Sequence, residues 1–195
     1  MTPTKTFLLS FLCVASALAE PELIVHWPLD EASAGFTPDA LGRYPLELVN
    51  LSESDLETGR RGQAFAFVGS DETLLARTHG ADDDLPINQH GDFSVSLWVK
   101  GQGEGQRDFR VFSEGSTGSG TPLFNIGTDA GGNSGLIDIF IRPGSNHRLS
   151  DVPAFDDAWH HVMWVQEGDG ARLYIDGEED GVAFSAAEGL DVDIT

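Results

Sequence analysis

Apolar and polar residues alternate along several short stretches of this sequence, and this period-two pattern constrains the fold more than any other feature. Between residues 93 and 100 the odd positions are Phe, Val, Leu and Val, whereas the even positions are Ser, Ser, Trp and Lys. Such alternation is typical of a β-strand that buries one face. Val162–Val165 and Ala171–Ile175 are predicted strands as well, and the Gly168–Gly170 turn between them predicts a hairpin.

Weaker strand signals are distributed over the rest of the chain, and helical periodicity is nearly absent. They occur at Leu23–Leu29, Leu46–Leu51, Ala64–Val68, Arg110–Ser113, Leu123–Ile126, Leu136–Arg142 and Gly181–Phe184. Glycine, aspartate and serine fill the intervening segments, most densely at Gly115–Gly120 and Asp129–Gly135. Many short strands with glycine-rich connections favour an all-β sandwich or barrel in one domain.

The first residues have the order of a secretory signal peptide. Lys5 provides a positive charge, an apolar run extends over Phe7–Ala15, and small residues precede a cleavage position near Ala19. The run is shorter than the roughly 20 residues that span a bilayer, and the alternative is a short buried helix. We expect residues 1–19 to be removed and residues 20–195 to form the mature domain, which is secreted, periplasmic or at the cell surface. No later apolar stretch is long enough for a transmembrane helix.

The charge and the cysteine content exclude several classes of function. Acidic residues outnumber lysine and arginine by 32 to 11, and the formal net charge is −21. Such a surface repels nucleic acids and anionic headgroups, so we expect no nucleic-acid partner. It favours cations such as calcium, whose protein ligands are oxygens, although the charge can also serve solubility alone. Cys13 lies in the predicted signal peptide, so the mature domain contains no disulfide.

Five short motifs follow one another along the chain. They are His26–Glu31, Gly59–Asp71, Phe93–Lys100, Trp159–Val165 and Leu173–Gly177, the second of which has the form G-x-x-G-x-A-x-x-F-x-G-x-D. Over about residues 23 to 184, this series resembles the laminin-G-like jelly-roll domains of the concanavalin-A-like lectin and glucanase superfamily. The resemblance implies an all-β fold in which two antiparallel sheets, one of them concave, pack as a jelly-roll sandwich.

Domains of this type continue beyond the strand that corresponds to Leu173–Gly177. They add a strand that ends in Ile-Gly and another with a Gly-x-Ile-Asp-Asp-x-Arg-like motif, whereas this sequence stops at Thr195. A jelly roll without its last strands leaves sheet edges unpaired. We therefore expect the sequence to be a fragment that lacks its last C-terminal strands.

The resemblance also provides a test for catalysis. Glucanases of this superfamily carry Glu-x-Asp-x-x-Glu on one strand, with one glutamate as nucleophile and the other as acid/base. The corresponding run keeps Asp138 but has Leu136 and Ile141 at the two glutamate positions. A retaining mechanism needs both carboxylates, so we expect no enzyme activity. A polysaccharide hydrolase or lyase with another arrangement of catalytic groups is the alternative.

Two parts of the sequence contain residue types that can bind metal ions. His160 and His161 are adjacent, and adjacent strand residues point to opposite faces, so a structural role is favoured over chelation of one ion by both. Calcium is the favoured ion because the superfamily often holds it through aspartate, asparagine and backbone oxygens. The candidate calcium ligands are Asp30, at the end of the first strand, and Asp71, after a Gly-Ser turn.

A sugar site on this fold needs an aromatic platform with planar polar side chains beside it. Trp98 and Trp164 are the candidate platforms, with the alternative that both are core residues. The candidate polar neighbours are Asp108, Arg110, Asn125, Asp138 and Arg142. The loops 101–108, 115–122 and 129–135 are expected to set specificity.

These features together predict a secreted, non-catalytic module that binds a glycan or an extracellular or cell-surface protein, with calcium as the candidate cofactor. A purely structural module of a larger surface protein is a further alternative, since the fold alone would suffice for that role. Binding to a glycan array separates these two hypotheses, and turnover of polysaccharides would identify the enzyme.

Overall fold

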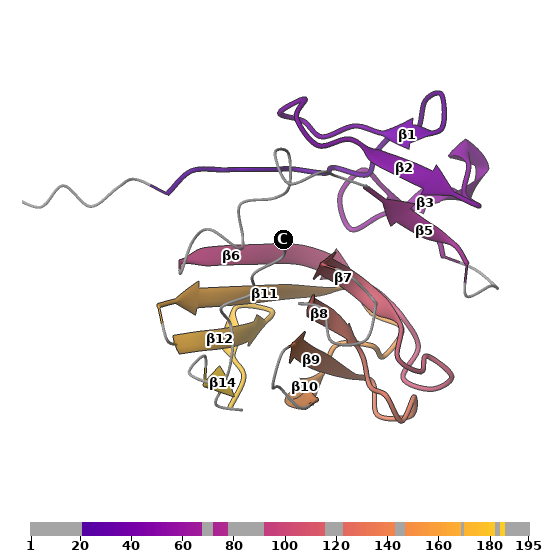
Figure 1. Ribbon diagram of the computed structural model, residues 1–195. Helices are drawn as coiled ribbons and strands as arrows, with labels where there is room; N and C mark the ends of the chain where they lie inside the picture. The colour runs from indigo at the N-terminus through magenta and orange to yellow at the C-terminus, as the bar shows by residue number, and fades with distance from the viewer. Residues whose placement is uncertain are drawn as a thin grey trace, which may run out of the picture.

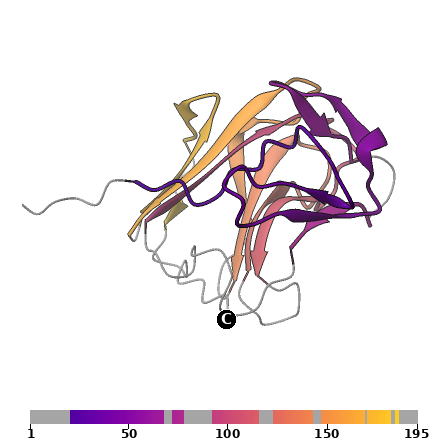
Figure 2. The same ribbon diagram turned by 90° about the horizontal axis from the view of Figure 1, so that it is seen from above.

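The structure is a computed structural model that describes residues 21–67, 72–77, 92–115, 123–142, 147–168, 170–181 and 184–185. The predicted signal peptide, the candidate ligand Asp71 and most of the 115–122 loop lie outside the described residues. The described strands form two main antiparallel sheets that face each other, with a smaller N-terminal region beside them (Figure 1). Figure 2, seen from above, shows the two sheets as separate layers.

One main sheet is built on the strongest strand signals of the sequence. Its described strands are β6 (Phe93–Val99), β11 (His160–Glu167), β12 (Gly170–Ile175), β13 (Glu178–Glu179) and β14 (Phe184–Ser185). β11 lies between β6 and β12, while β13 and β14 both pair with β12. Trp164 is opposite Val95 on one side and Leu173 on the other, so the apolar positions of three strands line up on one face.

The second main sheet has its described strands in sequence order. They are β7 (Arg110–Gly115), β8 (Leu123–Thr128), β9 (Leu136–Arg142) and β10 (Arg148–Pro153), and each neighbouring pair is antiparallel. The sequence does not predict β10, because its apolar residues do not alternate. Long-range bonds hold it instead, since Ser150 Oγ accepts a hydrogen bond from Ile137 N at 3.0 Å.

The hydrophobic core lies between the two main sheets. Phe124 and Trp164 are fully buried there, with their ring centroids 5.6 Å apart. Phe93 and Phe112 pack edge-on against Phe124. The other buried core residues are Val99, Ile126, Ile137, Ile139, Ile141, Ala154, Phe155, Val162, Ala171, Leu173 and Ile175. Each sheet therefore has one face in the core and one outer face.

The N-terminal region forms two small sheets beside β6 (Figure 1). One contains β1 (Phe36–Thr37), β2 (Leu46–Val49) and β5 (Leu74–Ala76); the other contains β3 (Leu56–Thr58) and β4 (Gln63–Phe65), and the 3-10 turn η1 (Glu53–Asp55) precedes β3. The buried carboxylate of Asp39 organises the first loop. It accepts hydrogen bonds from the backbone N–H groups of His26, Leu41, Arg43 and Tyr44.

The predicted all-β jelly-roll sandwich is confirmed, and most predicted strands lie within two residues of the observed ones. The strand predicted at residues 23–29 is wrong. There, the backbone of His26 bonds to the Asp39 side chain and to Ala40 N instead of to a neighbouring strand. Over the described ranges there is no α-helix, and hence no helix with the length and apolar character needed to cross a membrane.

Candidate functional site

The outer face of the sheet β7–β10 carries two polar side chains that are almost completely buried. In β8 and β9 the residues on either side of Asn125 and Asp138 belong to the core, so these two side chains point outward. Asn125 is 5% exposed and Asp138 is 1% exposed. Polar residues on the outer face of an antiparallel sheet are normally solvated, so burial distinguishes this pair from the other described polar residues on the outer face of β7–β10.

Gly127 creates space between these two side chains. It is paired with Asp138 across β8 and β9, and Asn125 lies two residues before it on the same face. A Cβ atom at Gly127 would come within 2.9 Å of Asn125 Nδ2 and 2.6 Å of the Phe109 carbonyl oxygen. The amide of Asn125 therefore leans over Gly127, in the direction of Asp138, and any larger residue at this position would separate the pair.

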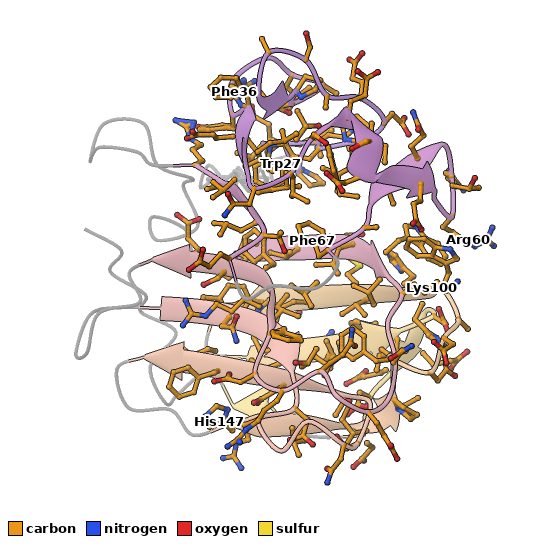
Figure 3. All side chains as sticks on the ribbon, turned by 90° about the vertical axis from the view of Figure 1, so that its right-hand side faces the viewer. Trp27, Phe36, Arg60, Phe67, Lys100 and His147 are labelled. Carbon is orange, nitrogen blue, oxygen red and sulfur yellow. The ribbon has the colours of Figure 1, made fainter. Side chains whose placement is uncertain are left out.

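His147 covers Asp138 from the β10 side of the sheet. Its Nδ1 lies 2.5 Å from Asp138 Oδ2, and its ring stacks on Phe140 with centroids 4.6 Å apart and 20° between the planes. The side chain of His147 is 47% exposed, whereas that of Asp138 is 2% exposed. Figure 3 shows His147 at the edge of the sandwich, immediately before β10. The imidazole of His147 thus lies over Asp138, where it contacts the carboxylate by a hydrogen bond and Phe140 by ring stacking.

Two oxygens of this site, Asn125 Oδ1 and Asp138 Oδ1, are buried and have no hydrogen-bond partner within the part of the chain that the structure describes. A buried polar atom without a partner costs about 1–3 kcal/mol, and native proteins keep few of them. Burial raises the pKa of Asp138 more than the His147 hydrogen bond lowers it, and the charges of Asp108 and Asp129 raise it further. The two oxygens therefore lack partners, and the surroundings of Asp138 on balance disfavour its charged form.

Exposed apolar side chains flank this polar pair on the two neighbouring strands. Val111 of β7 is 38% exposed and Leu149 of β10 is 37% exposed. Leu149 is the direct cross-strand partner of Asp138, and Ser113, on the same face as Val111, is the partner of Asn125. The face thus combines a few hydrogen-bonding groups with an apolar rim, which is the usual composition of a small-ligand site.

The predicted specificity loops 101–108 and 129–135 pack against each other at one end of this sheet. Arg107 Nε donates a hydrogen bond to Ala130 O at 2.9 Å. Asp129 accepts two hydrogen bonds from within its own loop, and these bonds lower its pKa. The 129–135 loop therefore holds the Asp129 carboxylate in place, and its charge acts on Asp138.

The structure brings together part of the predicted ligand-binding set. Asn125 and Asp138 share the outer face described above, and Asp108 and Arg110 are exposed at the start of β7, where Arg110 pairs with Gly127. Arg142 lies on β9, but its side chain is outside the description. The polar part of the prediction is thus centred on β8 and β9.

Neither tryptophan faces this site, which corrects the prediction of an aromatic platform beside these polar residues. Trp164 is fully buried between the sheets because it lies on the inner face of β11, against Phe124. Trp98 is 41% exposed, so it is not a core residue either, but it lies on the outer face of the other sheet. There its ring centroid is 5.2 Å from that of His161 and 5.1 Å from the guanidinium carbon of Arg60.

The candidate calcium ligand Asp30 has a different observed role. Its Oδ1 accepts a hydrogen bond from Gln63 N at 2.7 Å, and its backbone oxygen accepts one from Gln63 Nε2 at 2.7 Å. Asp30 thus stabilises the β3–β4 hairpin. Its carboxylate occupies the space that a Cβ atom at Gly62 would need. Calcium takes about six to eight oxygen ligands. Within the described residues, no group of three or more His, Cys, Asp or Glu side chains is placed to hold a metal, and the other candidate ligand, Asp71, lies outside them.

The adjacent histidines point to opposite faces, as strand alternation predicts. His160 Nδ1 lies 2.7 Å from Asp176 Oδ2, and its Nε2 lies 2.9 Å from Asp156 Oδ1. Both ring nitrogens therefore donate to carboxylates, which requires the imidazolium form. Partial burial lowers the pKa of His160, but these two bonds outweigh it and the net pKa is raised. His161 Nε2 contacts Ser96 Oγ at 2.8 Å.

Sequence reasoning did not identify His147 or Gly127 as part of the site. His147 has no regular spacing to Asp138, and it reaches the carboxylate only because β10 folds back beside β9. Gly127 did carry a usable signal. A glycine inside a strand run often marks a place where another group approaches the backbone closely, and the run Leu123–Thr128 contains one.

Residues 76–192 match a family model described as the concanavalin A-like lectin/glucanases superfamily. The match covers more than half of the chain and extends from the end of β5 past β14, so it includes both main sheets. The resemblance predicted from the motifs starts earlier, at about residue 23, and most of the N-terminal region therefore lies outside the matched residues. A search of curated proteins found no match.

Proposed function

The chain belongs to the concanavalin A-like lectin/glucanases superfamily, and from this premise we propose that it is an exported, non-catalytic module that binds a glycan on the outer face of β8 and β9. Membership identifies a carbohydrate- or protein-binding module in general. The finer assignment to a glycan depends on the side chains of Asn125 and Asp138.

The two unpartnered oxygens of the described site carry this proposal. Asn125 Oδ1 and Asp138 Oδ1 are acceptors, so a ligand that satisfies both must present two hydrogen-bond donors. Diagonal neighbours on adjacent strands are about 7–8 Å apart, with their Cβ atoms somewhat closer, and the Asn125 amide leans toward Asp138. Two hydroxyl groups of one sugar ring meet this requirement. The apolar rim of Val111 and Leu149 suits the C–H faces of the same ring.

A ligand reaches Asp138 when His147 moves aside. The His147 side chain is about half exposed and its contacts to the site are one hydrogen bond and one stack. Exposed side chains change rotamer within nanoseconds, and such a rotation leaves the β8–β9 backbone unchanged. In this proposal, β8 and β9 form the rigid base of the binding site, and the side chain of His147 rotates to expose Asp138.

Two features of β9 support a non-catalytic role. Its outward positions carry Leu136, Asp138 and Phe140, so this strand contributes a single carboxylate to the face. Ile141, at the second glutamate position of the glucanase motif, points into the core and is 7% exposed. A retaining glycosidase needs two carboxyl groups about 5–5.5 Å apart, and β9 does not provide such a pair.

Export is part of the same proposal, because residues 1–19 have the order of a signal peptide. Mass spectrometry of the protein recovered outside an expressing cell is expected to give an N-terminus near Glu20. An intact Met1 on the exported protein, or retention of the whole chain inside the cell, would contradict this part of the proposal.

A glycan array followed by calorimetry tests the proposed site. Asn125→Leu and Asp138→Leu remove the acceptors with little change in volume, and we expect Asp138→Leu to weaken binding about tenfold or more. Glu57→Gln, an exposed acid on β3, is the control and should bind as the wild type does. Loss of binding in Trp98→Ala alone would place the site on the other sheet. Shortened oligosaccharide products would favour the hydrolase or lyase, and binding to no glycan would favour the structural module.

A further inference from the structure

The polar pair on β8 and β9 lies in an acidic environment. The charges that act most strongly on Asp138 are those of His147, Asp108 and Asp129. Asp138 and His147 form an ion pair when the imidazole is protonated. The exposed Arg110, which pairs with Gly127, offsets one of the two loop carboxylates, so one negative charge remains among these five side chains. Arg107, from the same loop as Asp108, is directed to the Ala130 carbonyl oxygen.

We infer that the ligand of the glycan site is an amino sugar, an inference that rests on the proposed function. The protonated amine of this sugar binds Asp138, and a neighbouring hydroxyl group binds Asn125. The inference follows from the two acceptors, because they differ in charge. An ammonium group has donors and no acceptor, and its bond to a carboxylate is about twice as strong as a neutral hydrogen bond. The amide oxygen of Asn125 is neutral and suits a hydroxyl group.

The same carboxylates discriminate against anionic sugars. A uronate or a sulfate group placed beside Asp138 would meet a like charge in a buried site, which opposes binding unless one group is protonated. The formal net charge of −21 adds repulsion at longer range. An N-acetylated sugar keeps its hydroxyl groups but has lost the cation. The expected order of affinity is therefore amino sugar first, N-acetylated sugar second and uronate last.

Calorimetry of the full chain as exported tests this order with three oligosaccharides of equal length. They are β-linked oligomers of glucosamine, of N-acetylglucosamine and of a uronic acid, measured at about pH 6, where amines are protonated. We expect the glucosamine oligomer to bind at least about tenfold more tightly than the N-acetylated one. The difference should shrink as salt is added, because charges at the edge of the site are screened.

Asp108→Asn is the matched charge variant for this test. Asp108 is exposed with a φ of 55°, a backbone conformation that asparagine also tolerates. The variant should reduce the preference for the glucosamine oligomer over the N-acetylated oligomer about two- to fivefold. This factor corresponds to the interaction free energy of one exposed charge pair. Its affinity for the N-acetylated oligomer, which carries no positive charge, should change by a smaller factor than its affinity for the glucosamine oligomer. Glu57→Gln removes one charge on β3, outside the site, and should change neither affinity.

The outcomes separate the inference from the proposed function. Equal or tighter binding of the N-acetylated or uronate oligomer would overturn the amino-sugar inference and leave the glycan site intact. Binding of none of the three would also overturn the inference, and the glycan array with Asn125→Leu then decides the proposed function by itself. Tight binding of a lysine-rich peptide in place of the glucosamine oligomer would overturn both, since a protein would then be the partner.

Discussion

The guanidinium carbon of Arg60 lies 5.1 Å from the centroid of the Trp98 ring. This contact joins the loop between β3 and β4 to the outer face of β6. Figure 3 shows Arg60 near Lys100, the residue that follows β6. His161 supports the indole from the neighbouring strand. The exposed tryptophan that suggested a sugar platform thus holds two parts of the fold together.

Removal of this cation–π contact should loosen the N-terminal region from the sandwich. We expect Arg60→Ala to cost about 0.5–1 kcal/mol of stability and to make tryptophan fluorescence more sensitive to a soluble quencher. Arg61→Ala is the matched control, because Arg61 is the adjacent exposed arginine in the same turn. Equal quenching of the two variants would contradict a specific role for Arg60.

The His160 network predicts a loss of stability in mildly alkaline solution. The pKa of His160 is raised in the folded state, whereas those of its partners Asp156 and Asp176 are lowered. The contribution of the imidazolium is therefore complete below the unfolded pKa of about 6.5 and is lost as pH rises through the folded pKa. Thermal unfolding midpoints measured from pH 6 to 9 should fall in the wild type.

His160→Gln should remove most of this pH dependence, because a glutamine side chain does not titrate. His26→Gln is the control, since the exposed His26 bonds to Asp39 through its backbone and not its ring. A wild-type midpoint that stays constant from pH 6 to 9 would show that His160 is not held as an imidazolium.

Asp138→Asn should stabilise the protein in the absence of ligand while weakening the proposed glycan site. A carboxyl group with a raised folded pKa destabilises the native state increasingly as pH rises above about 4, the unfolded value. The asparagine keeps an oxygen that can accept from His147 but carries no charge. We expect a gain of about 1–2 kcal/mol at pH 7 in urea unfolding. If Asp138→Asn were less stable than the wild type and still bound the glycan, ligand binding would not explain why a carboxylate is buried at this position.

Asp39→Ala should destabilise the N-terminal region. Burial raises the pKa of Asp39, but the hydrogen bonds that its carboxylate accepts from four backbone N–H groups outweigh this effect and lower the pKa overall. Loss of this acceptor leaves those donors unpaired, and we expect a cost of about 2–4 kcal/mol. In the wild type this contribution is present above about pH 4 and is lost as pH falls through the lowered pKa. Glu47→Ala on β2 should have little effect by the same urea titration.

Calcium binding stays a prediction from the superfamily resemblance and the acidic composition. We expect calcium to raise the thermal unfolding midpoint relative to excess chelator, because an ion that binds the native state stabilises it. Asp30→Asn should keep this response, since Asp30 bonds to Gln63 in the β3–β4 hairpin. Loss of the calcium response in Asp30→Asn would indicate that Asp30 is a calcium ligand.

The longest strands were predictable because their signal is local. The predicted strand Leu136–Arg142 coincides with β9, and Phe93–Lys100 exceeds β6 by one residue. β10 lacks such a pattern and depends on distant groups. The buried carboxylate of Asp180 accepts hydrogen bonds from Asp151 N and Val152 N, which fixes this strand beside the end of β13. No window of sequence around β10 contains that information.

The sequence by itself determined where most strands run and which of their residues alternate toward the core, because side-chain direction in a strand depends only on neighbouring positions. Only the tertiary structure decided which strands share a sheet. That pairing separates Trp98 from Asp138 on different sheets and brings His147 and Gly127 to Asp138. The physical reason is that strand register is a relation between distant segments, set by the packing of both. A candidate site made from several strands is therefore a property of the fold.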